Sequence, residues 1–290
     1  MIVRPLFPGE ALPKGLSIGH ASEPSGKSGL TVLLFDPWAK GGASLFGRAT
    51  STRQADSLRA KHHVSRLDAF LMTGGSAFGL GATNGVLTYL AERERGLPTP
   101  YGAVPIVPTA ALFDLGYAKG APRPDAQLAY EACKQAAATL PAKGSVGAGA
   151  GATVGKLFGL AQASKGGFGA AWANEGAAQV WAFAFVNAFG DIKHPETGAI
   201  LAGARQSPDS EEFLDTAKAL AQGLAPKGFG NAPSPENTVL VALVTPNPLD
   251  KTALCRLAGH AGKAFAHVVS PITRADGDLV FAASLHSEQI

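Results

Sequence analysis

A threonine that begins an apolar strand directly after a loop has the most distinctive chemical potential in this sequence. Residues 226–237 are rich in Gly, Pro, Asn and Ser, and residues 238–245 (TVLVALVT) are typical of a buried strand. A threonine hydroxyl is a poor nucleophile unless a base lies beside it. If the bond between Asn237 and Thr238 is broken, the freed α-amine of Thr238, with a pKa of about 8, becomes that base. The junction is therefore compatible with a nucleophile and base on one residue, although ordinary threonines at strand starts share this local pattern.

Metal-binding and nucleotide-binding motifs fail on their spacing. His62 and His63 are adjacent and the other histidines are scattered, so the usual zinc spacings are absent. Residues 147–156 (GAGAGATVGK) imitate a phosphate loop, but Ala150 replaces its first glycine and Leu157 its Ser or Thr. The segment also fails as a dinucleotide-binding fingerprint. It follows a predicted helix instead of a strand, and it lacks the acidic residue expected about 20 positions later. We expect no metal and no organic cofactor.

Nucleophilic serine or cysteine chemistry is not favoured either. The glycines around Ser76 have the wrong offsets for a nucleophile elbow, and neither Cys133 nor Cys255 has a setting that lowers a thiol pKa. Both cysteines lie in apolar helical patterns, which indicates two buried free thiols in a reducing compartment. With no apolar signal-peptide region at the N-terminus, we expect a cytoplasmic protein.

Composition and charge exclude two classes of partner. The net charge is +3, from 25 basic and 22 acidic residues, and the basic stretch at residues 59–66 has no interleaved aromatic side chains. No run of 18 apolar residues is present. We therefore expect neither nucleic-acid binding nor membrane insertion.

Strand and helix patterns run along the whole chain of 290 residues, with no fixed repeat and no domain boundary. Strands are predicted at residues 29–35, 67–72, 180–186, 238–245 and 279–285. Helices are predicted at residues 78–94, 126–140 (with Asp125 as N-cap), 210–224 and 250–264. Several strands are apolar on both faces, so we predict a single α/β domain, 1–290, with stacked sheets and helices outside both.

Seven segments, in the same order along the chain, resemble the family of L-aminopeptidase D-alanine-esterase/amidases, which includes β-aminopeptidases and 6-aminohexanoate-oligomer hydrolase. The most specific is residues 71–80 (LMTGGSAFGL), close to the family's LTGGSAFGL motif. The others are residues 15–20, 47–56, 105–115, 147–156, 237–238 with the strand that follows, and 276–281. The resemblance covers nearly the whole chain. It implies an αββα sandwich of the N-terminal-nucleophile type.

The resemblance also implies catalytic roles. Thr238 matches the nucleophile, which would first cut its own chain after Asn237. Asn187 matches a residue whose amide helps to stabilise an oxyanion, and strand periodicity places it on the face of Phe183 and Phe185. The alternative is an asparagine that caps a turn.

Three charged residues complete the implied catalytic set. Asp276 and Asp278 match a carboxylate pair that orients the nucleophile, and in an extended chain both would point the same way. Lys156 resembles a lysine beside the nucleophile. The alternatives are a solvated turn for the aspartates and a surface position for the lysine.

Glycines would let the backbone approach a substrate closely, and we assign Gly74, Gly75, Ser76 and Gly149 to substrate or oxyanion binding, with turn geometry as the alternative. One position departs from the family. Phe113 stands where the family often has a tyrosine whose hydroxyl contributes to the site, and this puts the family's pattern of substrate binding in doubt.

The combined expectation is an autoprocessing amide or peptide hydrolase that works through an acyl-enzyme. Cleavage would give an α-chain, 1–237, and a β-chain, 238–290, and the αβ units would assemble into a homo-oligomer. The substrate would be a small peptide or amide. The rival interpretations are an acyltransferase of the ornithine-acetyltransferase type and a non-catalytic family member.

Overall fold

One long strand, β3 (Gly29–Leu45), belongs to both β-layers of the fold. Its residues 29–35 pair with β2 (Leu16–Ser22), whereas its residues 39–45 pair with β17 (Leu279–Leu285). The register against β5 (Arg66–Thr73) shifts between Leu34 and Ala39. The two stacked sheets are therefore joined by hydrogen bonds through β3. This computed structural model describes residues 1–225, 237–273 and 276–285.

The two layers continue on either side of β3. The first layer contains β2, β5 and two short strands, β8 (Thr109–Ala111) and β4 (Ser51–Arg53). The second runs outward from β17 through β15 (Thr238–Thr245), β12 (Ala178–Asn187), β11 (Gly167–Glu175) and β1 (Ile2–Pro5). Neighbouring strands are antiparallel except for β15 with β17 and β5 with β8.

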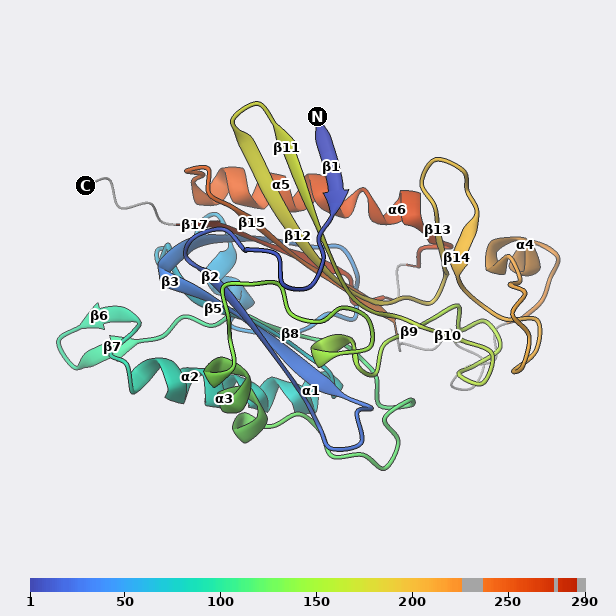
Figure 1. The fold of residues 1–290 in the computed structure, drawn as a ribbon, viewed down its shortest axis with the longest axis horizontal. Helices are drawn as coiled ribbons and strands as arrows, with labels where there is room; N and C mark the ends of the chain where they lie inside the picture. The colour runs from blue at the N-terminus through green and yellow to red at the C-terminus, as the bar shows by residue number, and fades with distance from the viewer. Residues whose placement is uncertain (226–236, 274–275, 286–290) are drawn as a thin grey trace.

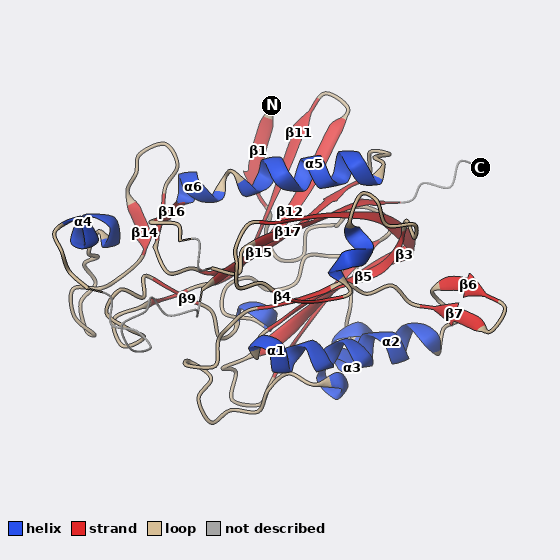
Figure 2. Cartoon of the chain, turned by 180° about the vertical axis from the view of Figure 1, so that it is seen from behind, coloured by secondary structure: helices blue, strands red, loops and turns tan. Residues whose placement is uncertain are grey.

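Helices cover the outer faces of both sheets (Figures 1 and 2). On the first sheet lie α1 (Ser76–Gly79), α2 (Thr83–Ala91) and α3 (Ala126–Lys134). On the second lie α5 (Lys251–Gly262), which connects β15 with its parallel neighbour β17, and α6 (Phe265–Val268). The αββα sandwich predicted from the sequence is confirmed.

Three apolar clusters hold these layers together. Between the sheets lies the largest, with Phe70, Phe183 and Phe281 completely buried. A second cluster packs α2 and α3 on the first sheet, and a third packs α5 on the second. Successive residues of β12 alternate between the inter-sheet core and the face covered by α5, which is why Asn187 shares the inward face of Phe183 and Phe185.

Short elements complete the described part of the chain. The remaining strands are β6 (Leu97–Thr99), β7 (Gly102–Val104), β9 (Thr153–Val154), β10 (Ser164–Lys165), β13 (Asp191–Lys193), β14 (Ile200–Ala202) and β16 (Val269–Ser270). The remaining helices are α4 (Thr216–Ala221) and the 3-10 turns Ala55–Leu58, Leu80–Ala82 and Gly147–Gly149. No helix among the described residues is both long and apolar enough to span a membrane.

Three of the predicted helices are shorter than expected. The helix predicted at residues 126–140 ends at Lys134, because Ala137 pairs with Ile18 of β2 instead of continuing the helix. The helix predicted at 210–224 spans only Thr216–Ala221, because Phe213 pairs with Arg205. The segment at 78–94 is divided into α1, a 3-10 turn and α2.

The predicted N-cap Asp125 is confirmed, since its side chain accepts from the Leu128 amide. Cys133 is buried, and burial raises the pKa of its thiol to about 12. Cys255 is half-buried instead of buried as predicted. The predicted loop at residues 226–236 lies outside the described residues.

Candidate active site

Thr238 is the first residue of the central strand β15, and it is paired with Asn187, the last residue of β12. The β-branched, apolar sequence of residues 238–245 suits a strand covered on both faces, with the inter-sheet core on one side and α5 on the other. The side chains of both residues are buried, with 4% of Thr238 and 1% of Asn187 exposed. The sheet thus places a hydroxyl and a carboxamide side by side in a dry environment.

The carbonyl oxygen of Asn237 receives two donors. The Thr238 hydroxyl donates to it at 2.6 Å, and the backbone N–H of Gly277 donates at 2.9 Å. A hydroxyl beside the preceding carbonyl is close to the group that it would attack in an N→O acyl shift. The Gly277 amide polarises the same carbonyl and would stabilise the negative charge that develops on its oxygen.

The segment with both aspartates is fixed against this junction. The Val239 amide donates to Asp278 Oδ1 at 2.7 Å, and the Phe46 amide donates to the Asp278 carbonyl oxygen at 2.9 Å. Gly277 is required here because an added Cβ would lie 2.8 Å from Thr238 Oγ1 and from the Ala49 carbonyl oxygen. The interpretation of this segment as a solvated turn is wrong, since Asp276 and Asp278 are 1% and 3% exposed.

Both carboxyl groups hold their protons more tightly than an exposed aspartate. Burial, together with the charge of Asp276, raises the pKa of Asp278 to about 7, although the Val239 amide opposes this shift. Burial also raises the pKa of Asp276, against the opposing effects of the Thr273 hydroxyl, the Lys156 charge and a hydrogen bond from the Asn237 side chain. A carboxyl with a pKa near neutrality can accept and return protons at physiological pH.

Lys156 connects the two sides of the junction. Its ammonium donates to Asn187 Oδ1 at 2.9 Å, to the Asn187 carbonyl oxygen at 3.1 Å and to Asn237 Oδ1 at 3.2 Å. The side chain follows β9 and is 4% exposed, so the surface position considered as an alternative is wrong. A buried cation bound to several oxygens favours the ionised form of the nearby Asp276.

The side chain of Asn187 is oriented by three other groups. Its Oδ1 accepts from Lys156 and from the Thr153 amide at 3.0 Å, and its Nδ2 donates to the Phe113 carbonyl oxygen at 3.0 Å. These contacts fix which way the carboxamide points. Phe113 therefore contributes to this network through its backbone, which a tyrosine in its place would do equally.

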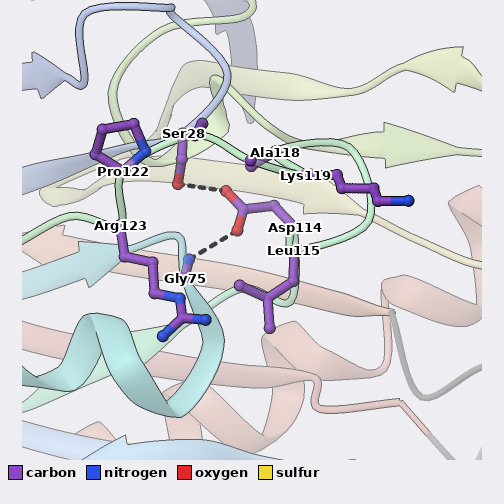
Figure 3. Close-up of a pocket in the computed structure, with 10 residues that line it drawn as sticks. Ser28, Gly75, Asp114, Leu115, Ala118, Lys119, Pro122 and Arg123 are labelled. Carbon is purple, nitrogen blue, oxygen red and sulfur yellow. Dashed lines mark hydrogen bonds between the residues drawn. The ribbon is translucent and has the colours of Figure 1, made fainter.

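Two of the glycines assigned to substrate binding, Gly74 and Gly75, lie against a different buried carboxylate, Asp114. The Gly75 amide donates to Asp114 Oδ1 at 2.7 Å, and the Ser28 hydroxyl donates to Oδ2 at 2.7 Å (Figure 3). A Cβ on Gly74 would lie 2.2 Å from Oδ2, so that position needs glycine for close packing. Ser28, Gly75 and Asp114 border a cavity of about 230 Å³ that also reaches Arg123.

The other two assigned positions have backbone contacts. The Ser76 amide donates to the Leu112 carbonyl oxygen at 2.9 Å, and Ser76 itself has a φ of 54°. Gly149 is buried, and a Cβ there would lie 2.6 Å from the Phe168 nitrogen. Their roles in substrate binding stay predictions.

Sequence reasoning missed Gly277, Asp114 and Thr273 as parts of these networks. Gly277 had a signal, because it separates the two aspartates of the 276–278 segment. Asp114 follows the position compared with the family tyrosine, but nothing in its local pattern indicated a buried acceptor of two hydrogen bonds. Within the described residues, no group of three or more His, Cys, Asp and Glu side chains is arranged to hold a metal ion.

Sequence comparison matches residues 14–290 to the model of Peptidase family S58. An uncharacterized aminopeptidase of Mycobacterium tuberculosis (strain H37Rv) is 37% identical over 284 residues, which cover 92% of this chain and 78% of the relative. A 6-aminohexanoate-oligomer endohydrolase of Kocuria sp. is 26% identical over 274 residues, covering 93% of this chain and 73% of that enzyme.

Solved structures share the fold. The β-aminopeptidase of Burkholderia sp. has a TM-score of 0.63 at 20% identity, covering 98% of this chain and 75% of the other. The L-aminopeptidase D-Ala-esterase/amidase of Ochrobactrum anthropi, described as a variant of the Ntn hydrolase fold, has a TM-score of 0.66 at 17% identity, covering 98% and 78%.

Proposed function

The chain belongs to Peptidase family S58 and is a hydrolase of peptide or amide bonds, and we propose that it is an N-terminal-nucleophile enzyme that cuts itself between Asn237 and Thr238. The observation that carries this proposal is the Thr238 hydroxyl, 2.6 Å from the Asn237 carbonyl oxygen, with the Gly277 amide on the same oxygen. Nucleophile and oxyanion donor are thus both present at one peptide bond.

The self-cleavage begins with attack of Thr238 Oγ1 on the Asn237 carbonyl carbon. The hydroxyl proton passes to a carboxylate of the Asp276–Asp278 pair, and the Gly277 N–H binds the oxyanion. The C–N bond then breaks as the Thr238 nitrogen takes up a proton, which leaves an ester on Oγ1. Water hydrolyses this ester to a new carboxyl end at Asn237 and a free Thr238 amine and hydroxyl.

Substrate hydrolysis repeats this chemistry with the new amine as base. An amine with a pKa of about 8 removes the hydroxyl proton near neutral pH, so that Oγ1 attacks the substrate carbonyl and forms an acyl-enzyme. Water then releases the acyl group. Lys156, whose ammonium bonds the side chains of Asn187 and Asn237, acts as a positioning residue at the junction. The Asn187 carboxamide is the further group that we assign to stabilisation of the oxyanion.

The substrate is a small peptide or amide. Relatives named as aminopeptidases and as 6-aminohexanoate-oligomer endohydrolases favour short α-peptides and linear ω-amino-acid oligomers as the first compounds to assay. We further propose that the cleaved α-chain and β-chain stay together and assemble into a homo-oligomer of αβ units.

Intact mass under denaturing conditions tests the proposal. Wild type is expected to give two chains that separate between Asn237 and Thr238, whereas Thr238→Ala gives one uncut chain. Thr238→Ser, which keeps a hydroxyl, is the matched control and is expected to be cut. A wild-type chain that stays intact and yet hydrolyses peptides would contradict self-cleavage at this bond.

A further inference from the structure

Asn237 is held at both its backbone and its side chain, as a bound substrate residue would be. Its carbonyl oxygen accepts from Gly277 N–H and the Thr238 hydroxyl, and its Oδ1 accepts from Lys156 Nζ at 3.2 Å. The side chain also makes a hydrogen bond to Asp276. Only 1% of the residue is exposed, so its side chain is buried.

The two groups around this side chain complement a primary carboxamide. A carboxamide offers an oxygen to the Lys156 ammonium and N–H groups to the Asp276 carboxylate. An aspartate side chain would bring a second negative charge towards Asp276, and a leucine of similar shape would make neither hydrogen bond. In a site this deeply buried, lost hydrogen bonds to charged groups are costly.

The same space has to serve the mature enzyme. Self-cleavage breaks one bond, and Gly277 remains beside the Thr238 hydroxyl while Lys156 and Asp276 remain around the place of the Asn237 side chain. A substrate carbonyl must reach this hydroxyl from the position that the Asn237 carbonyl has in the uncut chain. The residue that carries it then directs its side chain between Lys156 and Asp276, once the new carboxyl end at Asn237 has withdrawn.

We propose that the mature enzyme prefers amides whose acyl residue is asparagine, with the substrate carboxamide in the place that the Asn237 side chain occupies between Lys156 and Asp276. This inference rests on the proposed function, because it needs Thr238 as the nucleophile. It adds a substrate class. Asn237 is then the enzyme's own first substrate residue, and one pocket sets the rate of both reactions.

The test compares p-nitroanilides of L-Asn, L-Asp, L-Leu, L-Gln and L-Ala on purified, fully cleaved enzyme. We expect kcat/KM for the Asn compound to exceed that for the Leu and Asp compounds by about tenfold or more, because sites built to hydrogen-bond a polar group reject analogues that lack it. Gln, longer by one methylene, is expected to react more slowly than Asn in a closed site.

A second arm changes the internal substrate in the uncut chain. Asn237→Leu, Asn237→Asp and Asn237→Gln are refolded from denaturant, and self-cleavage is followed by intact mass. We expect the same order of rates as for the p-nitroanilides, with wild type fastest. If a variant does not refold, the p-nitroanilide rates alone still decide whether the mature enzyme prefers asparagine.

The outcomes separate the two proposals. A cleaved enzyme that hydrolyses the Leu or Ala compound as fast as the Asn compound, or that hydrolyses none of the five, overturns the asparagine preference and leaves self-cleavage standing. A wild-type chain that stays uncut overturns self-cleavage and the preference together.

Discussion

Two buried aspartates at strand ends, Asp191 and Asp278, have similar exposure but different surroundings. Asp191, at the start of β13, accepts from the Ala204 amide at 3.0 Å and from the Thr216 amide and hydroxyl, each at 2.7 Å. Asp278, before β17, accepts from the Val239 amide and lies near Asp276. Burial raises the pKa of both, to about 7 for Asp278.

We propose that this difference separates a structural carboxylate, Asp191, from a reactive one, Asp278. Asp191 joins β13 to the first turn of α4 and to residue 204, so its oxygens are committed to holding three segments together. Both carboxyls have a neighbour of like charge, Asp215 for Asp191 and Asp276 for Asp278, but Asp278 bonds the Val239 amide beside the junction, and its pKa of about 7 keeps proton exchange accessible at neutral pH. We therefore expect changes at Asp191 to affect stability and changes at Asp278 to affect cleavage.

Replacement of Asp191 is expected to have the largest effect on stability. Asp191→Ala leaves three buried donors without their acceptor, and should lower the free energy of unfolding by roughly 3 kcal/mol or more. Urea denaturation of uncut Thr238→Ala chains measures this effect. Asp209→Ala, at an exposed position, is the control and should change stability by less than about 0.5 kcal/mol. Equal losses in the two variants would contradict the structural role.

Replacement of Asp278 is expected to affect mainly the reaction. Asp278→Asn keeps an oxygen for the Val239 amide but cannot accept a proton, so self-cleavage should slow by about 100-fold, as for loss of a general base. Refolding followed by intact mass gives the rate. In a Thr238→Ala background the same change should not lower the urea midpoint at pH 8. If Asp278→Asn lowered the free energy of unfolding as much as Asp191→Ala, Asp278 would be a structural carboxylate like Asp191, and the proposed contrast between the two would be wrong.

The pH dependence of the free energy of unfolding tests the raised pKa of Asp278 directly. The folded chain keeps the Asp278 proton up to about pH 7, whereas the unfolded chain releases it near the usual value of 3.8. The stabilisation from this group is complete below about pH 4 and is lost as the pH rises through 7. Relative to its Asp278→Asn form, the Thr238→Ala chain should thus lose a few kcal/mol between pH 4 and 8.

The Thr238→Ala chain has to be compared with its Asp278→Asn form because His20 changes stability with pH in the opposite direction to Asp278. Burial lowers the pKa of His20 to about 4, so the chain loses stability as the pH falls from 6.5 through 4. His20 is present in both chains, and its contribution cancels in the difference. A difference that is flat with pH would mean that Asp278 titrates normally.

The smallest effect is expected at the position that departs from the family. The Phe113 carbonyl oxygen, a backbone atom, accepts from Asn187 Nδ2. Phe113→Tyr keeps this contact and should change the self-cleavage rate by less than about threefold, within the range of a surface substitution. Intact-mass kinetics beside wild type would reveal a larger change, which would indicate that a hydroxyl at residue 113 acts on the scissile carbonyl.

The sequence predicted the buried strands best. The strands at 238–245 and 279–285 match β15 and β17 in both bounds, because they are apolar on both faces and each is bounded by polar residues. Helix ends were predicted less well. The signal that continued a helix beyond Lys134 was local, whereas the pairing of Ala137 with Ile18 that ends it is a contact between residues far apart in sequence.

The candidate site was predicted as residue identities but not as contacts. Thr238 and Asn187 were both named from the family resemblance, yet their pairing depends on β12 and β15 being neighbours, which no local pattern reveals. The Gly277 amide was missed because the position of Gly277 between the two aspartates marks the segment but does not show which backbone N–H donates to the Asn237 carbonyl oxygen. Lys156 was found from its neighbours in sequence, while its burial follows from the packing of β9 against β12.

A labelled mature enzyme tests the central claim, that the bond before Thr238 is cut and its hydroxyl then becomes the nucleophile. The purified protein is treated with an acylating β-lactone, denatured, and both chains are weighed and sequenced. We predict one adduct per molecule, carried by the chain that begins at Thr238 and located on that residue. An adduct on residues 1–237, or an active protein whose chain starting at Thr238 stays unmodified while another residue is acylated, would contradict the account.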